Sequence, residues 1–334
     1  MRAAVLHAQA PIDSNPLRLE DVDVPRPGEG ELLVRIEACA CCRTDLHVIE
    51  GDLPPVKLPV IPGHQITGKV AAMGPNARLF RQGQRVGVAW LRHVDGTCRY
   101  CLEGRENLCP NARFTGYMAD GGYAEYATVD EDFAYQLPEE LAPEQAAPLL
   151  CAGIIGYRAL KRSEIRPGGR LGIFGFGGSA HVTIQVALHW GCEVYVATRG
   201  EMHATLAQDM GASWVGQAED LPPAELDAAI LFAPVGRLVP VALKSLGRGA
   251  TLALAGIYMS EIPPLAYERD LFYERSLRSV TANTRRDGRE LLTLAAEIPI
   301  RSRVTTFALA DVNAALHALK HDAVSGAAVV KVGD

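Results

Sequence analysis

The sequence predicts an α/β protein of two domains, a β-rich N-terminal domain and a doubly wound parallel sheet. Three observations support this fold class. The chain has 334 residues, more than one ordinary hydrophobic core holds. Residues 1–150 carry short alternating apolar runs between Gly and Pro turns, and from about residue 154 strand-like and helical patterns alternate.

The first region alternates with the period of a half-buried strand. In ELLVRIEACA (31–40), Val34 and Ile36 alternate with Arg35 and Glu37. VIPGHQITGKVAAMG (60–74) and GQRVGVAWL (83–91) repeat the pattern after glycine or proline turns. Such runs predict a barrel-like all-β domain.

In the second region, short apolar runs typical of strands alternate with apolar patterns typical of helices. This alternation indicates βαβ units and a parallel sheet. Its expected strands are RLGIFGFGG (170–178), CEVYVATR (192–199), LDAAILFAP (226–234) and ATLALAG (250–256). Its expected helices are AHVTIQVALHW (180–190), EMHATLAQDMG (201–211) and VPVALKSLG (239–247). Beyond residue 286 we expect helices in GRELLTLAAEI and VNAALHALK and a last strand in AAVVKV.

A glycine loop follows the first strand of the second region. It reads Gly175-x-Gly177-x-x-Ala180, with Gly178 beside the second glycine. The first glycine permits the tight turn, the second lets a pyrophosphate approach the backbone, and Ala180 suits close helix packing. The free N–H groups of the following helix favour an anion. The loop therefore predicts dinucleotide binding, against the alternative of a turn made only for packing.

Composition excludes several classes of protein. Apolar residues make up 48% and charged residues 22%, a globular balance, and the net charge of −6 disfavours nucleic acid as a partner. The start lacks an apolar signal region, and no apolar run reaches the length of a membrane span. We therefore expect a cytoplasmic protein that does not act at a membrane.

Three of the eight cysteines lie close together in DGTCRYCLEGRENLC (95–109). Cys98, Cys101 and Cys109 stand on a polar stretch, and C-x2-C on a loop is a metal-binding spacing. Asp95 extends the spacing backwards to D-x2-C-x2-C-x7-C, so that a carboxylate completes four ligands. His93 is the alternative fourth ligand. With four protein ligands the expected zinc is structural.

Cys42, His64 and Cys151 are further metal-ligand types, but they are far apart in the sequence. Each has an ordinary explanation. Cys42 follows two other cysteines, His64 follows Pro-Gly, and Cys151 lies in an apolar stretch. Composition and spacing do not join them.

The sequence as a whole resembles the zinc-dependent alcohol dehydrogenases of the medium-chain dehydrogenase/reductase superfamily. The segments that carry the resemblance follow in order along nearly the whole chain. They are CRTDLHVIEGDLP, PGHQITGKV, the cysteine stretch, GRENLCPNARFTGY, DGGYAEY, AAPLLCAGIIGYRAL and GIFGFGGSAH.

The resemblance implies a GroES-like catalytic domain, formed by residues 1–153 and 288–334. It also implies a Rossmann domain of residues 154–287 and a structural-zinc lobe at about residues 93–112. In the family, the residues matching Cys42, His64 and Cys151 hold a catalytic zinc, so two zinc ions per subunit are expected. Such a zinc acts as a Lewis acid while hydride passes between an alcohol/aldehyde pair and NADP(H) or NAD(H).

Further roles follow from the same resemblance. Thr44 and His47 match a proton relay, against the alternative of a capped short helix. Asp45 matches the carboxylate that orients the zinc-bound histidine. Arg43 matches a residue that reaches the cofactor pyrophosphate. Trp90 matches a wall of the substrate pocket that favours slim substrates, and plain core packing is the alternative.

Two positions depart from the family pattern. Asp95 replaces the first of the four cysteines usual in the lobe. Gln65 stands where the family usually has a glutamate behind the zinc, which removes one compensating negative charge. We interpret Gln65 as a modulation of activity, because the zinc ligands and the relay remain.

The end of the second Rossmann strand favours NADP over NAD. NAD-specific domains place an acid there to accept from the ribose 2′-hydroxyl. Thr198 stands at that position, followed by Arg199, and Glu201 lies beyond the strand. Thr198 and Arg199 suit a 2′-phosphate, unless Arg199 only faces solvent.

Two other functions are possible on such a chain: a zinc-free quinone reductase of the same fold, and a non-catalytic, zinc-stabilised nucleotide-binding protein. Zinc-free quinone reductases lack the residues matching Cys42, His64 and Cys151, so the sequence argues against that function. The expected partner is a small alcohol or aldehyde. The resemblance also implies a homo-oligomer, a dimer or tetramer joined through Rossmann domains.

Overall fold

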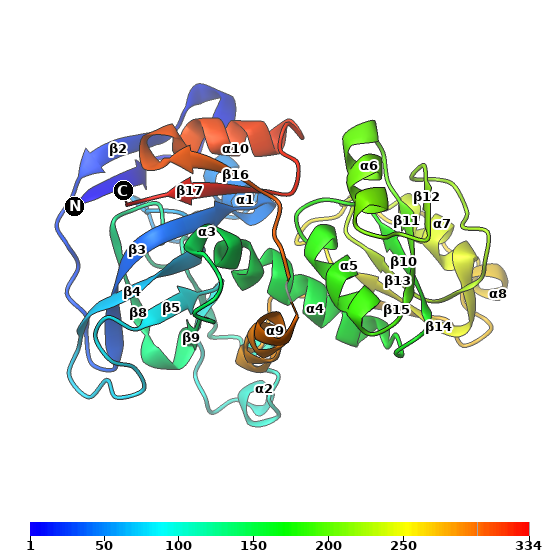
Figure 1. The fold of residues 1–334 in the computed structure, drawn as a ribbon, viewed down its shortest axis with the longest axis horizontal. Coiled ribbons are helices and arrows are strands. Elements are labelled where there is room, and N and C mark those ends of the chain that lie inside the picture. The colour runs from blue at the N-terminus through cyan, green and yellow to red at the C-terminus, as the bar shows by residue number, and fades with distance from the viewer. Residues whose placement is uncertain (299, 334) are drawn as a thin grey trace. The chain divides into compact units, whose positions relative to one another are not determined.

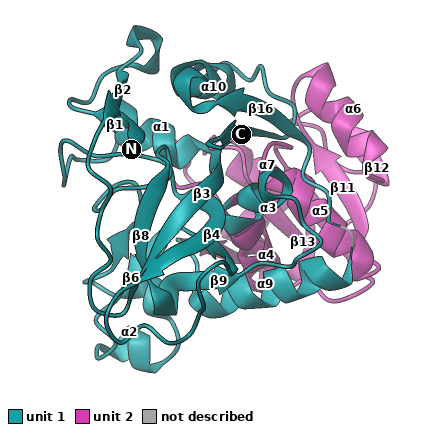
Figure 2. Ribbon diagram, turned by 60° about the vertical axis from the view of Figure 1, so that its left-hand side comes forward, with its two compact units in different colours: residues 1–151, 282–334 teal, residues 152–281 magenta. Residues whose placement is uncertain are grey.

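The computed structural model describes residues 1–298 and 300–333, and the chain forms two compact units (Figures 1 and 2). Unit 1 comprises Met1–Cys151 and Ala282–Asp334, and unit 2 comprises Ala152–Thr281. The first division falls two residues before the predicted boundary at 153. The second falls six residues before the predicted boundary at 287. The helix that follows is capped by Thr284 and packs on unit 1 through Gly288, against Tyr135.

Unit 1 is built on a predominantly antiparallel sheet in the order β16-β17-β3-β4-β5-β9, with β8 also paired to β3. The last strand of the chain, β17, pairs antiparallel with β3, so the C-terminal segment completes the first sheet. The strands are β3 (Glu31–Cys41), β4 (Gln65–Met73), β5 (Arg85–Val88), β8 (Tyr126–Asp130), β9 (Ala134–Gln136), β16 (Val304–Ala308) and β17 (Ala327–Lys331). Two small ribbons join β1 (Arg2–Leu6) to β2 (Leu17–Asp21) and β6 (Leu91–His93) to β7 (Arg113–Phe114).

The alternation in β3 explains why this strand is central. Leu32, Val34 and Ile36 are buried while Arg35 is exposed, so the strand turns one face to the core. The helices of unit 1 are α1 (Arg43–Glu50), α2 (Arg99–Leu102), α3 (Pro143–Ala146), α9 (Arg285–Glu297) and α10 (Val312–Lys320). Short 3-10 turns are η1 (Ile12–Ser14), η2 (Glu106–Leu108), η3 (Glu131–Phe133), η4 (Ala147–Leu150) and η5 (Leu309–Asp311).

Unit 2 is a parallel sheet in the order β12-β11-β10-β13-β14-β15. Numbered from its own first strand, this is the order 3-2-1-4-5-6 of a dinucleotide-binding Rossmann domain. The strands are β10 (Arg170–Phe174), β11 (Glu193–Ala197), β12 (Trp214–Gly216), β13 (Leu226–Leu231), β14 (Leu246–Leu254) and β15 (Ser276–Ser279). The helices are α4 (Ala152–Ser163), α5 (Ala180–His189), α6 (Glu201–Asp209), α7 (Leu238–Ser245) and α8 (Tyr267–Asp270).

The predicted fold class is confirmed, and the expected strands and helices of the second region are all present. The structure adds four elements to unit 2 that the sequence patterns do not predict: α4, α8, β12 and β15. The two strands have only three and four residues, mostly half-buried, so they carry no apolar alternation to detect, whereas α4 is a full helix of 12 residues that the pattern misses. No helix among the described residues is both long and apolar enough to cross a membrane.

Candidate active site and metal clusters

The structure brings Cys42, His64 and Cys151 together, and we call these three residues the active-site cluster. Their ligand atoms all lie within 4.8 Å of one another. Cys42 stands between β3 and α1, His64 directly precedes β4, and Cys151 follows η4. His64 is fully buried and the two cysteines are partly exposed. Three such residues could hold a zinc ion, and catalytic zinc sites are typically built from three protein ligands.

Asp45 contacts two members of the active-site cluster, His64 and Cys42. Its Oδ1 lies 2.8 Å from Nδ1 of His64, while its Oδ2 accepts a 2.9 Å hydrogen bond from the backbone N–H of Cys42. The same residues begin α1, because the Cys42 Sγ accepts from the N–H of Thr44 at 3.3 Å. With Nδ1 fixed by a carboxylate, Nε2 of His64 faces the Cys42 Sγ at 3.4 Å. One carboxylate therefore orients the imidazole and caps the helix.

The titrating groups of this cluster shift one another's pKa values. A hydrogen bond from the Cys151 thiol and the neighbouring His64 hold the pKa of Cys42 well below its ordinary value. The same hydrogen bond, with burial, raises the pKa of Cys151. Burial acts to lower the pKa of His64, but Asp45 and Cys42 outweigh it and raise that pKa to about 10. These shifts favour a thiolate at Cys42 beside a protonated His64.

Gln65 and Trp90 lie next to His64. The Gln65 Nε2 donates to the Ala40 carbonyl at 3.2 Å, and among the described residues no partner is found for its buried Oε1. The Trp90 ring meets His64 edge-on, with ring centroids 5.1 Å apart, and stacks on Phe114 at 4.9 Å. The indole is therefore held by an aromatic stack against the imidazole of the active-site cluster.

Thr44 and His47 lie on one side of α1, three residues apart. Thr44 is buried and His47 is partly exposed. The Nδ1 of His47 lies 2.6 Å from Oδ2 of Asp52. Asp52 was not singled out by the sequence, because nothing in its spacing marks it. The turn after α1 brings it back onto the helix.

Asp95, Cys98, Cys101 and Cys109 form a second group, which we call the lobe cluster; their ligand atoms also lie within 4.8 Å of one another. The Sγ atoms of Cys98 and Cys101 are 3.5 Å apart, and the Cys109 Sγ accepts from the backbone N–H of Asp95. Three of the four residues are half-buried. The alternative ligand, His93, lies outside the lobe cluster, with its ring against Phe133 at 6.4 Å.

Asp95 has a second role in the lobe. Its Oδ1 accepts from the backbone N–H groups of Thr97 and Cys98 at 2.9 Å, and its Oδ2 accepts from the Asn111 amide at 3.0 Å. These bonds, with the backbone N–H of Cys98 first, hold the pKa of Asp95 well below its ordinary value. The carboxylate is therefore fixed and anionic, as a metal ligand must be.

The glycine loop joins β10 to α5 in unit 2. Gly175 has φ +89°, and a Cβ there would lie 2.9 Å from the backbone nitrogen of Ala233, so the turn requires glycine. A Cβ on Gly177 would meet nothing within 4 Å, which leaves that backbone accessible. Ala180 is buried at the start of α5.

Other predicted cofactor residues have the following places. Thr198 is buried after β11, where its N–H donates to the Gly216 carbonyl, and Arg199 is exposed beside it. Arg43 forms a 2.7 Å ion pair with Asp322, and both side chains are about half exposed.

A buried histidine that the sequence patterns do not mark, His181, lies one residue after Ala180. No partner for its ring nitrogens is found in the described part of the chain, and burial lowers its pKa to about 4.

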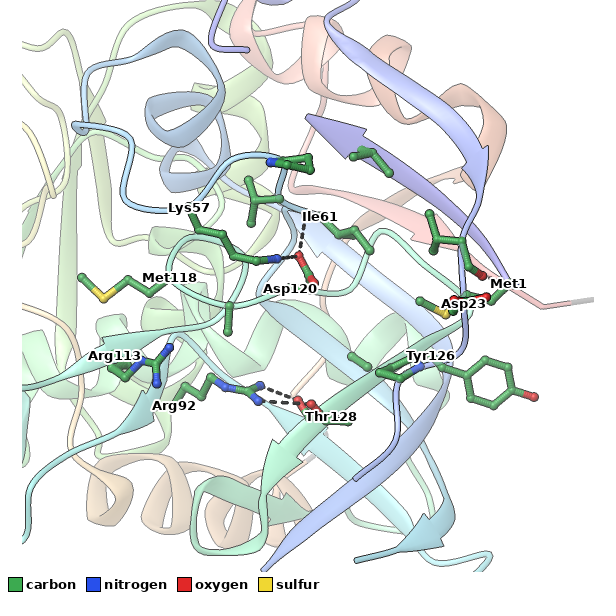
Figure 3. Close-up of a pocket in the computed structure, with 17 residues that line it drawn as sticks. Met1, Asp23, Lys57, Ile61, Arg92, Arg113, Met118, Asp120, Tyr126 and Thr128 are labelled. Atoms are coloured by element: carbon green, nitrogen blue, oxygen red, sulfur yellow. Dashed lines mark hydrogen bonds and ion pairs between the residues drawn. The ribbon is translucent and has the colours of Figure 1, made fainter. Parts of the chain in front are cut away.

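A pocket of about 630 Å³ lies elsewhere in unit 1 (Figure 3). It contains no member of either cluster. Two of its lining cations are paired: Lys57 pairs with Asp120, and Arg92 donates to the backbone carbonyl and the hydroxyl of Thr128 and to Glu31, which lies outside the lining.

Comparison with known proteins gives a consistent result. Residues 28–139 match the family described as alcohol dehydrogenase GroES-like domain. A protein of Mycobacterium tuberculosis named probable alcohol dehydrogenase AdhA is 50% identical over 337 aligned residues. The alignment covers 99% of this chain and 97% of that protein.

Solved structures agree over the whole chain. A cobalt- and zinc-bound thermostable alcohol dehydrogenase from Pyrobaculum aerophilum superposes with a TM-score of 0.90 at 26% identity, covering 99% of both chains. The CAD protein from Helicobacter pylori, complexed with NADP(H), superposes with a TM-score of 0.89 at 25% identity, again covering 99% of both chains.

Proposed function

This chain belongs to the zinc-dependent alcohol dehydrogenases of the medium-chain dehydrogenase/reductase superfamily, and we propose that the active-site cluster holds its catalytic zinc. The protein is an NAD(P)-dependent oxidoreductase that acts on alcohols and aldehydes. The observation that carries the proposal is that Cys42, His64 and Cys151 lie together, with Asp45 at Nδ1 of His64.

The donor set of the active-site cluster fits zinc. Two sulfurs and one imidazole nitrogen are ligands that zinc prefers, and the low pKa of Cys42 makes a thiolate available. Zinc bound there would supply a Lewis acid to the oxygen of an alcohol or aldehyde. Asp45 holds the proton of His64 on Nδ1, so Nε2 is the nitrogen that would give up its proton to become a ligand.

We propose that Thr44 and His47 carry the proton of the reaction. Thr44 is buried and its backbone N–H donates to the Cys42 Sγ, and we propose that its hydroxyl exchanges a proton with the substrate oxygen. His47, partly exposed and held by Asp52 at Nδ1, is proposed as the outer member that accepts or gives the proton. The Trp90 indole, fixed beside His64, would limit the width of the substrate.

We further propose that unit 2 binds the nucleotide through Gly175, Gly177, Gly178 and Ala180, with the pyrophosphate at the N-terminus of α5. Arg43 is proposed as a pyrophosphate contact from unit 1. It would first have to leave its exposed ion pair with Asp322. Exposed pairs of this kind contribute only about 0–1 kcal/mol, so breaking the Arg43–Asp322 pair requires little free energy.

The lobe cluster is proposed to hold a second, structural zinc, with Asp95 as the fourth ligand rather than His93. The support is the placement of Asp95 among the three cysteines and of His93 outside them.

We also propose a cytoplasmic place of action, because both clusters contain free thiols, which persist in a reducing compartment. We also propose a homo-oligomer, a dimer or tetramer, on the resemblance alone.

Neither alternative function is favoured. A zinc-free quinone reductase would not need a buried ligand set backed by a carboxylate. A non-catalytic nucleotide-binding protein would need neither an open fourth position nor an oriented His47. The relatives are named alcohol dehydrogenases.

Replacement of Cys42 with Ser tests the proposal. We expect kcat to fall on the order of a thousandfold, because a misplaced Lewis acid loses several kcal/mol of stabilisation at about 1.4 kcal/mol per tenfold. Zinc content should fall by up to one ion per chain while nucleotide binding stays. Cys192→Ser, at a buried cysteine of unit 2, is the matched control and should keep both zinc and activity. Near-normal turnover by the Cys42 variant would refute the assignment.

The cofactor preference is tested at Arg199. We propose NADP(H) over NAD(H), because Thr198 and Arg199 stand where NAD-specific domains carry an acid. The ratio of kcat/KM for NADPH and NADH should favour NADPH and fall about tenfold or more in Arg199→Ala. Arg248→Ala is the control, since Arg248 stacks on Tyr273 near the opposite end of the strands. A ratio that Arg199→Ala leaves unchanged would contradict the proposal.

A further inference from the structure

Three side chains far apart in the sequence meet on the surface of unit 1. Asp13 lies on η1, His317 on α10, and His321 at the C-terminal cap of that helix. Their possible ligand atoms lie within 4.8 Å of one another. Both imidazoles approach Oδ1 of Asp13, at 3.3 Å for Nε2 of His317 and 3.0 Å for Nε2 of His321. None of these residues belongs to the active-site cluster or the lobe cluster.

The spacing of His317 and His321 places both side chains on the same face of the helix end. They are four residues apart, and the N–H of His321 donates to the carbonyl of His317, so the helical hydrogen bond continues through the cap. Residues at i and i+4 share one face of a helix. Their rings lie 4.4 Å apart between centroids, which directs both Nε2 atoms to one place.

Asp13 is positioned by the structure around it. Ile12 is fully buried and its N–H donates to Oε1 of Glu50 on α1, which anchors η1. Lys320 bridges Oε1 of Glu50 at 2.9 Å and Oδ2 of Asp13 at 3.1 Å. The carboxylate is thus held through one oxygen while the other faces the histidines. Figure 1 shows α10 close to α1, and these helices are in contact.

The local charge allows a cation to bind. Asp13, Glu50 and Asp322 carry three negative charges, and Lys320 and Arg43 carry two positive charges in ion pairs with them. The side chains of Asp13, His317 and His321 are each about half exposed, so water can complete the coordination of a bound ion. Two imidazoles and one carboxylate suit divalent ions of the later transition series better than Mg²⁺ or Ca²⁺.

We propose that Asp13, His317 and His321 form a third metal site, for a divalent transition ion such as Ni²⁺ or Zn²⁺. The ion ties η1, near the N-terminus, to the end of α10, close to the C-terminus. It takes no part in hydride transfer. Because the site exists only when these segments are folded together, ion binding stabilises unit 1.

Calorimetric titration of the zinc-loaded enzyme with Ni²⁺ tests the site. The wild type should bind one Ni²⁺ per chain that a His317→Gln/His321→Gln double variant does not bind. Changes around a ligand already alter metal affinity about 10- to 100-fold, so His321→Gln alone should weaken binding by at least about tenfold. Basal alcohol oxidation should be unchanged and reports that the variants are folded.

The matched control is His7→Gln. His7 is an exposed histidine with a carboxylate partner, Glu20, at 2.8 Å, and it is not part of any ligand group among the described residues. It should leave Ni²⁺ binding unchanged. Equal Ni²⁺ binding by the wild type and the double variant would overturn the site.

A second measurement tests the third ligand and the tie between segments. Ni²⁺ should raise the melting temperature of the wild type, and Asp13→Asn should abolish most of this rise while weakening Ni²⁺ binding. Undiminished affinity in Asp13→Asn would overturn the three-ligand assignment. The absence of any Ni²⁺-dependent rise in the wild type would overturn the proposed stabilisation.

Discussion

The active-site cluster and the lobe cluster are both built around cysteines, with a histidine in the first and an aspartate in the second, and they differ in origin and surroundings. The first collects three ligands from segments up to 109 positions apart and places a fully buried histidine among them. The second takes four ligands from one stretch of 15 residues, and most of it is half-buried. Local spacing is enough to gather the four possible ligands of the lobe cluster, whereas the three of the active-site cluster meet only when the sheet is folded.

The two clusters also use a carboxylate differently. Asp45 lies outside the proposed ligand set, with one oxygen on His64 and the other on the backbone of Cys42. Asp95 belongs to the proposed set, while its Oδ1 also accepts from two backbone N–H groups. Loss of charge at Asp45 should therefore reduce turnover, and loss of charge at Asp95 should reduce stability.

The largest effect in this comparison is expected from Asp45→Asn. The amide keeps the size of the side chain but removes the charge that favours the proton on Nδ1 of His64. Outer partners of a metal ligand contribute about 10- to 100-fold to metal affinity or activity, and we expect a loss of kcat/KM in that range. Steady-state kinetics with zinc analysis measures it. Full activity with normal zinc content would show that Asp45 only caps α1.

An intermediate effect is expected from the lobe cluster. Asp95→Asn keeps hydrogen-bond acceptors for Thr97 and Cys98 but removes the anionic ligand, so zinc content should fall towards one per chain. The melting temperature should drop by about 5 °C, the scale of a local loss in a protein of this size, with little change in kcat.

The paired variants of this experiment are Asp95→Cys and His93→Ala. Asp95→Cys offers a thiolate at the same position and should retain the second zinc. His93→Ala should change neither zinc content nor melting temperature, because His93 packs against Phe133. If His93→Ala loses zinc and Asp95→Asn does not, the fourth ligand has been assigned wrongly.

The smallest effect is expected from Gln65→Glu, which restores the charge usual in the family. The Gln65 Nε2 donates to the Ala40 carbonyl, and a carboxylate would lose this bond while adding charge behind His64. These effects oppose each other, and we expect kcat to change by less than about tenfold. Exchange of the active-site metal for Co²⁺, followed by its absorption spectrum, should be faster in the variant. Slower exchange would contradict a role for charge at this position.

The sequence by itself determined features whose signal is local. The alternation of Val34 and Ile36 with Arg35 predicts β3, since side chains of a strand alternate between faces. The glycines at 175 and 177 predict the turn between β10 and α5, because they permit conformations and approaches that a Cβ would block. The spacing of Asp95, Cys98 and Cys101 brings a ligand group together within one loop.

Only the tertiary structure decided which distant side chains meet. Cys151 reaches Cys42 and His64 because of how the sheet of unit 1 is assembled, and before folding only the family resemblance joined them. The turn that brings Asp52 onto His47 leaves no periodic signal in the sequence. The same is true of Asp13, which reaches His317 and His321 across 304 positions or more. Contacts of this range depend on strand order and helix packing, which spacing along the chain does not encode.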